Sequence, residues 1–193
     1  SSVPAKDLRQ LIELARAKPG TLNYGSNGVG AVPHLAGELF RSLAGIDLVH
    51  VPYKGAGQVT TALLAGEVQL GFIVPAGQEQ NLRTGRLRAL TVAGPKRLPS
   101  LPDVPTSAEA GLPGLETYTW FGLTAAHGTP APIVVRLNAE INRAVADKEL
   151  QDTLTKQGVE ARGSTPQEYI QFVGTETEKW SKIIKSAGIK LEN

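Results

Sequence analysis

Residues 24–36 read YGSNGVGAVPHLA and follow the apolar Leu22. Residues 22–24 predict a short strand, and segment 25–30 is a loop rich in glycine, the residue that adopts the positive φ values of tight turns. Pro33 suits the first turn of a helix, and an apolar stripe from Leu35 to Leu43 continues that helix. This stretch therefore predicts a β-strand that runs through a glycine-rich loop into an α-helix.

The same alternation of strand, loop and helix continues C-terminal to this stretch. Apolar segments predict strands, and glycine-rich segments separate them from short helices. The predicted strands are residues 46–51, 68–74 and 87–92, and the second glycine-rich loop is 54–57. This alternation favours an α/β fold with a mainly parallel sheet. Ligands of such sheets bind beyond the carboxyl ends of the strands, where both glycine-rich loops fall.

The second half of the chain is rich in helices and poor in strands. Repeated prolines interrupt regular structure between residues 95 and 113. A further strand is predicted at 117–123, and helices are predicted at 133–145, at 150–157 and from an N-cap at Ser164. Amphipathic helices without a sheet to cover would expose apolar faces. We therefore expect them to pair with another copy as a homo-oligomer, to rearrange, or to cover other strands.

Composition excludes several classes of protein. The chain has 193 residues, with 20 Lys and Arg against 18 Asp and Glu, and no block of like charge that would bind nucleic acid. No apolar run approaches the roughly 20 residues that span a bilayer. The lack of cysteine excludes disulfides and thiol nucleophiles, and it suits an oxidising compartment. The first residues show no signal-peptide pattern.

The two glycine-rich loops are the candidate ligand site. Loop 26–30 would present backbone N–H groups and the Ser26 hydroxyl to an anion at a helix N-terminus. Segment 53–55 adds a tyrosine, a lysine and a flexible backbone at the next strand end. Together they favour a carboxylate, because N–H groups and an ammonium form charge-assisted hydrogen bonds with it. The alternatives are an ordinary strand-to-helix turn in the first loop and a solvated Lys54 in the second.

Signatures of phosphate binding and of serine hydrolysis are missing from these loops. Gly25, Gly28 and Gly30 do not form the G-x-G-x-x-G pattern of dinucleotide sites. No Gly-Lys-Ser/Thr follows residues 55–58, so the second loop is not a P-loop. The residues around Ser26 lack the G-x-S-x-G elbow of serine hydrolases. The sequence predicts no cofactor.

The histidines do not form a predicted metal or catalytic site. His34, His50 and His127 lack the spacing of metal ligands, and there is no thiolate to complete a site. Each is interpreted as structural, and His34 is the one nearest the candidate site. The sequence therefore predicts neither an enzyme nor a metal protein.

The chain resembles the Bug family, the extracytoplasmic solute receptors of tripartite tricarboxylate transporters. Residues 24–36 look like its Y-x-S-x-G-x-G-x-x-x-H-L-A segment. Similar segments follow in the family's order and spacing along essentially the whole chain. They are VPYKG (51–55), GRLRAL (85–90), LPDVPT (101–106), EAG (109–111), WFGL (120–123), GTP (128–130), KW (179–180) and AGIK (187–190).

The resemblance implies a type II periplasmic binding protein fold, in which two α/β lobes clamp a small carboxylate. It implies a periplasmic receptor that passes its solute to membrane permease subunits. Residues 8–118 would form the second lobe, and residues 119–193 would form a helix-rich C-terminal part of the first. Family members are expected to be longer at the N-terminus, so the leading strands of the first lobe would be missing.

The resemblance also implies a set of ligand-binding residues. The loop donors would be Ser26, Asn27, Gly28, Gly30 and Ala31, the facing wall Tyr53, Lys54 and Gly55, and the floor Ile73 and Val74. Ala31 and Val32 stand where the family often has hydroxyl residues, so backbone N–H groups remain as donors there. Ile73 stands where the family commonly has an aspartate, which favours a ligand with an apolar tail, such as an aromatic or long-chain acid.

Two other classes of function are alternatives. The same clamp fold serves as the effector-sensing domain of regulators, which would need a DNA-binding helix-turn-helix that these residues do not contain. A hydrolase or lyase would need a nucleophile and a base in one site, and the sequence offers no such set.

Overall fold

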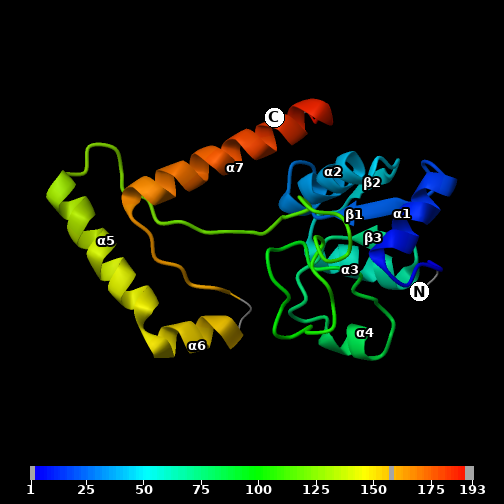
Figure 1. Ribbon diagram of the computed structural model, residues 1–193, viewed down its shortest axis with the longest axis horizontal. Helices are drawn as coiled ribbons and strands as arrows, with labels where there is room; N and C mark the ends of the chain where they lie inside the picture. The colour runs from blue at the N-terminus through cyan, green and yellow to red at the C-terminus, as the bar shows by residue number, and fades with distance from the viewer. Residues whose placement is uncertain (1–2, 157–158, 190–193) are drawn as a thin grey trace. The chain divides into compact units, whose positions relative to one another are not determined.

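A computed structural model describes residues 3–156 and 159–189 (Figure 1). The chain divides into two compact units, one of residues 1–119 with 182–193 and the other of residues 120–181. The sheet belongs to the first unit. The assignment of residues 8–118 and 119–193 to two lobes remains a prediction.

The first unit contains a small parallel sheet with the strand order β2-β1-β3. Its strands are β1 (Asn23–Ser26), β2 (Val49–Pro52) and β3 (Leu70–Gly71). Both neighbours run parallel to the central β1, so the mixed α/β fold with a parallel sheet is confirmed. The helices α2 (Val32–Ala44) and α3 (Ala56–Ala65) make the crossovers that parallel strands require.

Central strand β1 is covered on both faces. Figure 1 shows α2 and α3 on opposite sides of the strands. Tyr24, which is fully buried, packs its ring against Gly37 of α2, where a side chain would overlap it. On the other face, a Cβ at Gly25 would lie 3.0 Å from Val59 of α3. The two glycines thus let β1 approach both helices closely.

Two further helices and a proline-rich loop complete the first unit. Helix α1 (Leu8–Ala17) begins after Asp7, whose carboxylate accepts a hydrogen bond from the Gln10 N–H at 2.8 Å, and α4 (Glu79–Arg83) is short. Leu8, Leu11 and Ala15 of α1 are buried.

The predicted strands 87–92 and 117–123 are wrong among the described residues, and β3 is shorter than the predicted 68–74. In place of a strand, Val92 forms an isolated parallel bridge with Thr106 of the proline-rich segment. Prolines lack the N–H groups that would extend this ladder. Segment 117–123 has no strand beside it in the described chain, and Phe121 is 90% exposed. A β-strand needs such a neighbour to satisfy its backbone.

The second unit consists of helices and the segment that leads into them. Its helices are α5 (Ala131–Ala146), α6 (Lys148–Lys156) and most of α7 (Pro166–Ser186). Trp120 packs edge-on against Tyr169 and Phe172 of α7, with ring centroids 6.2 and 5.1 Å apart. The predicted end of the α6 helix at 157–158 lies outside the described residues.

The N-terminus of α7 differs from the prediction by one residue. Thr165, and not Ser164, caps it, because the Glu168 N–H donates to Thr165 Oγ1 at 3.2 Å and the Thr165 N–H donates to Glu168 at 2.8 Å. This reciprocal pair is a capping box. Apolar side chains on α5 and α7 are exposed, namely Ile133, Val135, Leu137 and Ile170. Within the described residues, no helix is long and apolar enough to cross a membrane.

Candidate functional site

Loops after β1 and β2 lie side by side at the carboxyl edge of the sheet. Ser26 and Pro52 are paired in the strand register, and the Tyr53 N–H donates to the Ser26 carbonyl oxygen at 2.8 Å. The parallel pairing brings together two loops that the sequence separates by a helix. We use the name strand-end site for residues 26–31, 53–55 and 73–74, which follow the three strands.

Glycine is required at two places in the first loop. Gly28 has φ +134° and Gly30 has φ +78°, conformations that residues with a side chain rarely adopt. The Ser26 hydroxyl donates to the Gly28 carbonyl oxygen at 3.0 Å, and the Ala31 N–H donates to the same oxygen at 3.3 Å. The loop is therefore folded tightly on itself before it enters α2.

Gly30 is a further expected ligand donor that is engaged within the protein, as the Ser26 hydroxyl and the Ala31 N–H are. The Gly30 N–H donates to Nδ1 of His34 at 2.9 Å, and His34 is 6% exposed. This bond turns the Gly30 amide toward the protein in this structure. Helix α2 begins after Ala31 without a side-chain cap. The N–H groups of a first helical turn have no intrahelical partner, so Val32 and His34 supply amide donors at the same place.

A layer of rings lies beneath the loop. Tyr24 and His50 are paired across β1 and β2, and their ring centroids are 4.9 Å apart. His34 of α2 stacks on His50 with centroids 3.8 Å apart and planes 6° from parallel. The Nε2 atom of His50 lies 2.6 Å from Oγ of the fully buried Ser26. The first strand, the second strand and the helix each contribute to this layer.

A buried charged network adjoins the rings. The Tyr24 hydroxyl donates to Glu38 Oε1 at 2.6 Å, and Arg41 donates to both oxygens of Glu38 at 3.0 Å. Arg41 also reaches Asp47 at 3.1 Å. Glu38 is only 8% exposed, and a buried charge needs partners. Tyr24 of β1 and Arg41 of α2 stabilise it.

Burial sets the protonation of these groups. Burial lowers the pKa of His34, although Glu38 opposes the shift. Burial and then the neighbouring His34 lower the pKa of His50 to about 4. Burial and the hydrogen bond to Glu38 raise the pKa of Tyr24. At neutral pH the layer therefore consists of neutral rings above a compensated ion pair.

The second and third loops add a cation and apolar surface. Lys54 is exposed, and its N–H donates to Gln58 Oε1 at 2.9 Å, which fixes the turn into α3. Gly55 caps α3 with an extended backbone. Ile73 is half-buried and Val74 is 70% exposed just after β3. The topology thus gathers every predicted ligand residue at one edge of the sheet, although their contacts with a ligand remain a prediction.

Ser26 and His50 have the contact distance of a nucleophile and its base. Three features argue against that chemistry. The Ser26 hydroxyl is fully buried, it is bonded to the loop's own carbonyl, and burial together with the stacked His34 lowers the pKa of the His50 base. A buried hydroxyl cannot reach a substrate carbonyl. The pair instead holds the loop against the sheet.

Sequence reasoning missed this pairing of histidines. His34 and His50 are separated by a helix and a turn, and neither spacing nor composition signals their stack. The one available signal is the strand register, since Tyr24 and His50 share a row when β1 and β2 pair. Within residues 3–156 and 159–189, no group of three or more His, Asp or Glu could hold a metal ion.

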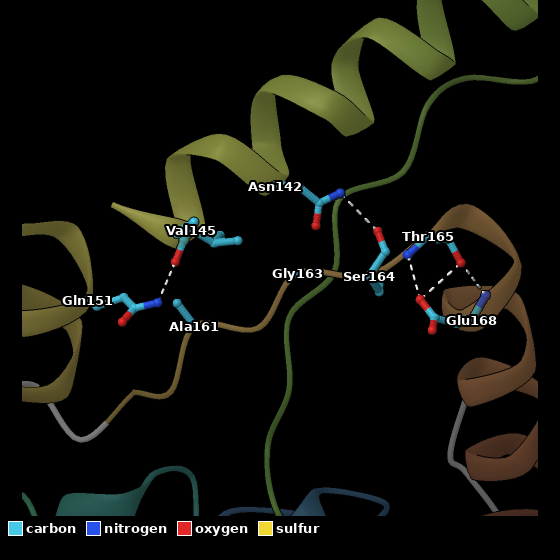
Figure 2. A pocket seen from close by; sticks show the side chains of 9 residues that line it. Asn142, Val145, Gln151, Ala161, Gly163, Ser164, Thr165 and Glu168 are labelled. Carbon is cyan, nitrogen blue, oxygen red and sulfur yellow. Dashed lines mark hydrogen bonds between the residues drawn. The ribbon is translucent and has the colours of Figure 1, made fainter. Parts of the chain in front are cut away.

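Two hollows lie away from the strand-end site. The one in the second unit has a volume of about 470 Å³, and its polar groups bond to the protein itself (Figure 2). Asn142 donates to the Ser164 carbonyl at 3.0 Å and Gln151 donates to the Val145 carbonyl at 2.8 Å. The one in the first unit, about 450 Å³, lies between α4 and residues 100–104 and is mainly apolar. Since the first hollow has polar groups bonded within the protein and the second is mainly apolar, the strand-end site remains the candidate.

Comparison with known sequences identifies relatives along almost the whole chain. The family described as "Tripartite tricarboxylate transporter family receptor" matches residues 1–189. A UPF0065 protein from the tcbD-tcbE intergenic region of Pseudomonas sp. strain P51 is 42% identical over 93% of this chain and 54% of its own length. Protein BugT of Bordetella pertussis is 33% identical over 96% of this chain and 57% of its own length. The chain thus spans about half the length of these curated relatives.

Solved structures show the same fold. Rpa4515 of R. palustris, solved with adipate, has a TM-score of 0.81 and 36% identity, over 98% of this chain and 63% of its own. MatC of Rhodopseudomonas palustris, solved with bound malate, has a TM-score of 0.73 and 33% identity, over 94% of this chain and 63% of its own. The periplasmic binding protein BugD has a TM-score of 0.74 and 28% identity, over 99% and 64%.

Proposed function

This chain belongs to the tripartite tricarboxylate transporter family of receptors, and we propose that it binds a small organic carboxylate at the strand-end site. The observation that carries the proposal is the hydrogen bond from the Tyr53 N–H to the Ser26 carbonyl, which holds two ligand loops side by side. The N-terminus of α2 comes directly after the first loop, and Lys54 comes directly after Tyr53 in the second. Both favour an anion over a neutral solute.

Each predicted residue has a role in this proposal. The exposed Asn27 and the first turn of α2 would surround one carboxylate oxygen pair. Ser26, Gly28 and Ala31 would shape the loop around it, because the Ser26 hydroxyl and the Ala31 N–H donate to the Gly28 carbonyl oxygen and the Gly28 N–H donates to Ser26 Oγ. Gly30 would act through its backbone shape, because its N–H is engaged by His34. Tyr53, Lys54 and Gly55 would form the wall that faces the first loop.

Apolar surface at the third loop bears on the rest of the ligand. Ile73 and Val74 would contact a hydrocarbon segment, which disfavours a ligand that is polar along its whole length. An aliphatic dicarboxylate such as adipate, which accompanies Rpa4515 in its structure, has this character. We therefore propose a carboxylate with an apolar chain or ring as the ligand class.

The proposal extends to the cellular role. A receptor of this family would act in the periplasm, bind its solute without chemical change, and deliver it to membrane permease subunits. Closure around the ligand would exclude water and strengthen the bonds from amides to carboxylate. A regulator's sensing domain has no specific observation in its favour.

Calorimetric titration tests the proposal. The probes are adipate, malate and benzoate, with the methyl ester of benzoate as the uncharged control. We expect heat from at least one acid, none from the ester, and weaker binding at higher salt. Absence of heat from every acid, in protein that unfolds cooperatively, would overturn the proposal. Conversion of a bound acid into product would instead revive an enzymatic function.

A further inference from the structure

His34 is placed to hold the first loop from within. It lies in the first turn of α2, and its Nδ1 accepts the Gly30 N–H at 2.9 Å. Gly30 has a positive φ and is the last glycine before α2, so this bond fixes a residue with wide conformational freedom at the entry to the helix. A nitrogen that accepts a hydrogen bond carries no proton, so His34 must be neutral with its proton on Nε2.

The surroundings of His34 are arranged for the neutral ring. Tyr24 faces it from β1 and His50 faces it from β2, with the His34 and His50 planes stacked 3.8 Å apart. Two imidazolium rings at this distance would repel each other. The charged groups near the pair are Glu38 and Arg41, both on α2. Glu38 is already bonded to Tyr24 and Arg41. These bonds limit how far its negative charge can stabilise a protonated histidine ring.

We propose that His34 is a positioning residue of the ligand site, which holds the loop at Gly30 in its receiving shape only while the stacked His34 and His50 are both uncharged. Protonation of His34 at Nδ1 replaces the acceptor with a second N–H donor and breaks the bond to Gly30. The effect on a carboxylate rests on the proposed function, whereas the anchoring of Gly30 does not.

The protonation equilibria agree with this geometry. Burial lowers the pKa of His34, and burial with His34 lowers the pKa of His50 to about 4. Both rings are neutral at pH 7, and the first proton enters the pair only in acid. The site is therefore held at neutral pH and released in acid, at a pH below the ordinary pKa of histidine.

Nuclear magnetic resonance measures the anchor without a ligand. In ¹⁵N-labelled protein, the bond from the Gly30 N–H to His34 Nδ1 joins two nitrogens and gives a scalar coupling across the hydrogen bond. We expect this coupling at pH 7.5 and its loss on titration to pH 4.5, together with an upfield shift of the Gly30 amide proton. A Gly30 amide without coupling at pH 7.5, or one indifferent to pH, would overturn the proposal.

Two variants separate positioning from packing. His34→Asn keeps an acceptor oxygen in reach of Gly30 and does not titrate, whereas His34→Leu fills similar space without an acceptor. His127→Asn is the matched control, because His127 is exposed and lies in the other unit. We expect the Gly30 amide shift to be kept and to become pH-independent in His34→Asn, and to be lost in His34→Leu. If His34→Leu does not fold, wild type and His34→Asn decide the question alone.

Adipate binding then tests the consequence for the site. At each pH, adipate has the same protonation state for all variants. The ratio of the affinities of two variants therefore reports only the effect of pH on the protein. Between pH 7.5 and 5.0 we expect wild type and His127→Asn to lose about tenfold more affinity than His34→Asn. Equal losses would overturn the proposal. If no variant binds adipate and the Gly30 coupling still depends on pH, the anchor stands and the proposed ligand class falls.

Discussion

The ring of Tyr24 lies directly against the backbone of Gly37, and this contact fixes how α2 sits on the sheet. Tyr24 is fully buried in the central strand. Its hydroxyl donates a hydrogen bond to Glu38, which follows Gly37 on α2. The packing of one glycine therefore sets both the helix position and the hydrogen bond beside it. Since α2 also carries His34, which is bonded to Gly30, the first loop of the strand-end site depends on this contact.

Replacing Gly37 by Ala will destabilise the protein. The new methyl group would overlap the Tyr24 ring, so either the helix or the ring must move, at a cost of about 1–3 kcal/mol. The free energy of unfolding in urea measures the effect. Gly57→Ala is the control, because nothing lies within 4 Å of a Cβ at that position of α3. Equal stability of the two variants would contradict the close contact.

Glu38→Gln will weaken the buried network by about 1–2 kcal/mol. The amide retains an acceptor for Tyr24 but loses the ionic attraction to Arg41, which also loses one of its two acceptor oxygens on residue 38. Urea denaturation at pH 7 is the measurement. The matched control is Glu140→Gln, whose partner Arg143 is 81% exposed, and where we expect a change below about 0.5 kcal/mol. A larger loss at Glu140 than at Glu38 would refute this account.

Acid will destabilise the protein partly through His50. The folded state lowers the pKa of His50 from 6.5 to about 4, so between these values the unfolded chain binds more protons. Stability from this residue is therefore full above about pH 6.5, falls as the pH decreases, and levels off near pH 4. We expect a contribution of about 2 kcal/mol after solvent screening.

Comparing variants isolates that contribution. Carboxylates also gain protons in this range, so the quantity to follow is the difference in unfolding free energy between wild type and His50→Gln from pH 7 to pH 4.5. As the pH falls, wild type should lose more unfolding free energy than His50→Gln. His127→Gln should track wild type throughout. A pH-independent difference for His50→Gln would show that the ring is not held neutral.

Lys54→Gln will weaken carboxylate binding about tenfold while leaving stability unchanged. Loss of one charge-assisted hydrogen bond at an exposed position accounts for this size. Lys18→Gln is the control, because Lys18 is also exposed but precedes β1, at the opposite edge of the sheet. Calorimetry with the tightest-binding acid checks both. Equal affinities in the two variants would remove Lys54 from the proposed site.

Local patterns predicted much of the first unit. The glycines around Ser26 and the apolar stripe after Pro33 predicted the turn from β1 into α2, because backbone freedom and helical periodicity are properties of neighbouring residues. Parallel pairing followed from the alternation of elements. The neighbouring positions of the first two loops followed from that pairing.

Predictions failed where a segment depends on a distant partner. Residues 87–92 and 117–123 have apolar, β-branched sequences, but a strand forms only beside another strand. Val92 forms a single bridge with Thr106 in the proline-rich segment. The prolines there lack the N–H groups that would extend this bridge into a ladder. Propensity alone carries no information about that partner.

The amino-acid sequence by itself determined the order of strands, loops and helices from β1 to β3 and the resemblance that led to a receptor family, because these are written in contiguous residues. Only the tertiary structure decided that His34 accepts the Gly30 N–H and stacks on His50. These contacts join residues from a helix and two strands. Their geometry follows from the register of β1 with β2 and from the close approach of α2 at Gly37, neither of which any local pattern encodes.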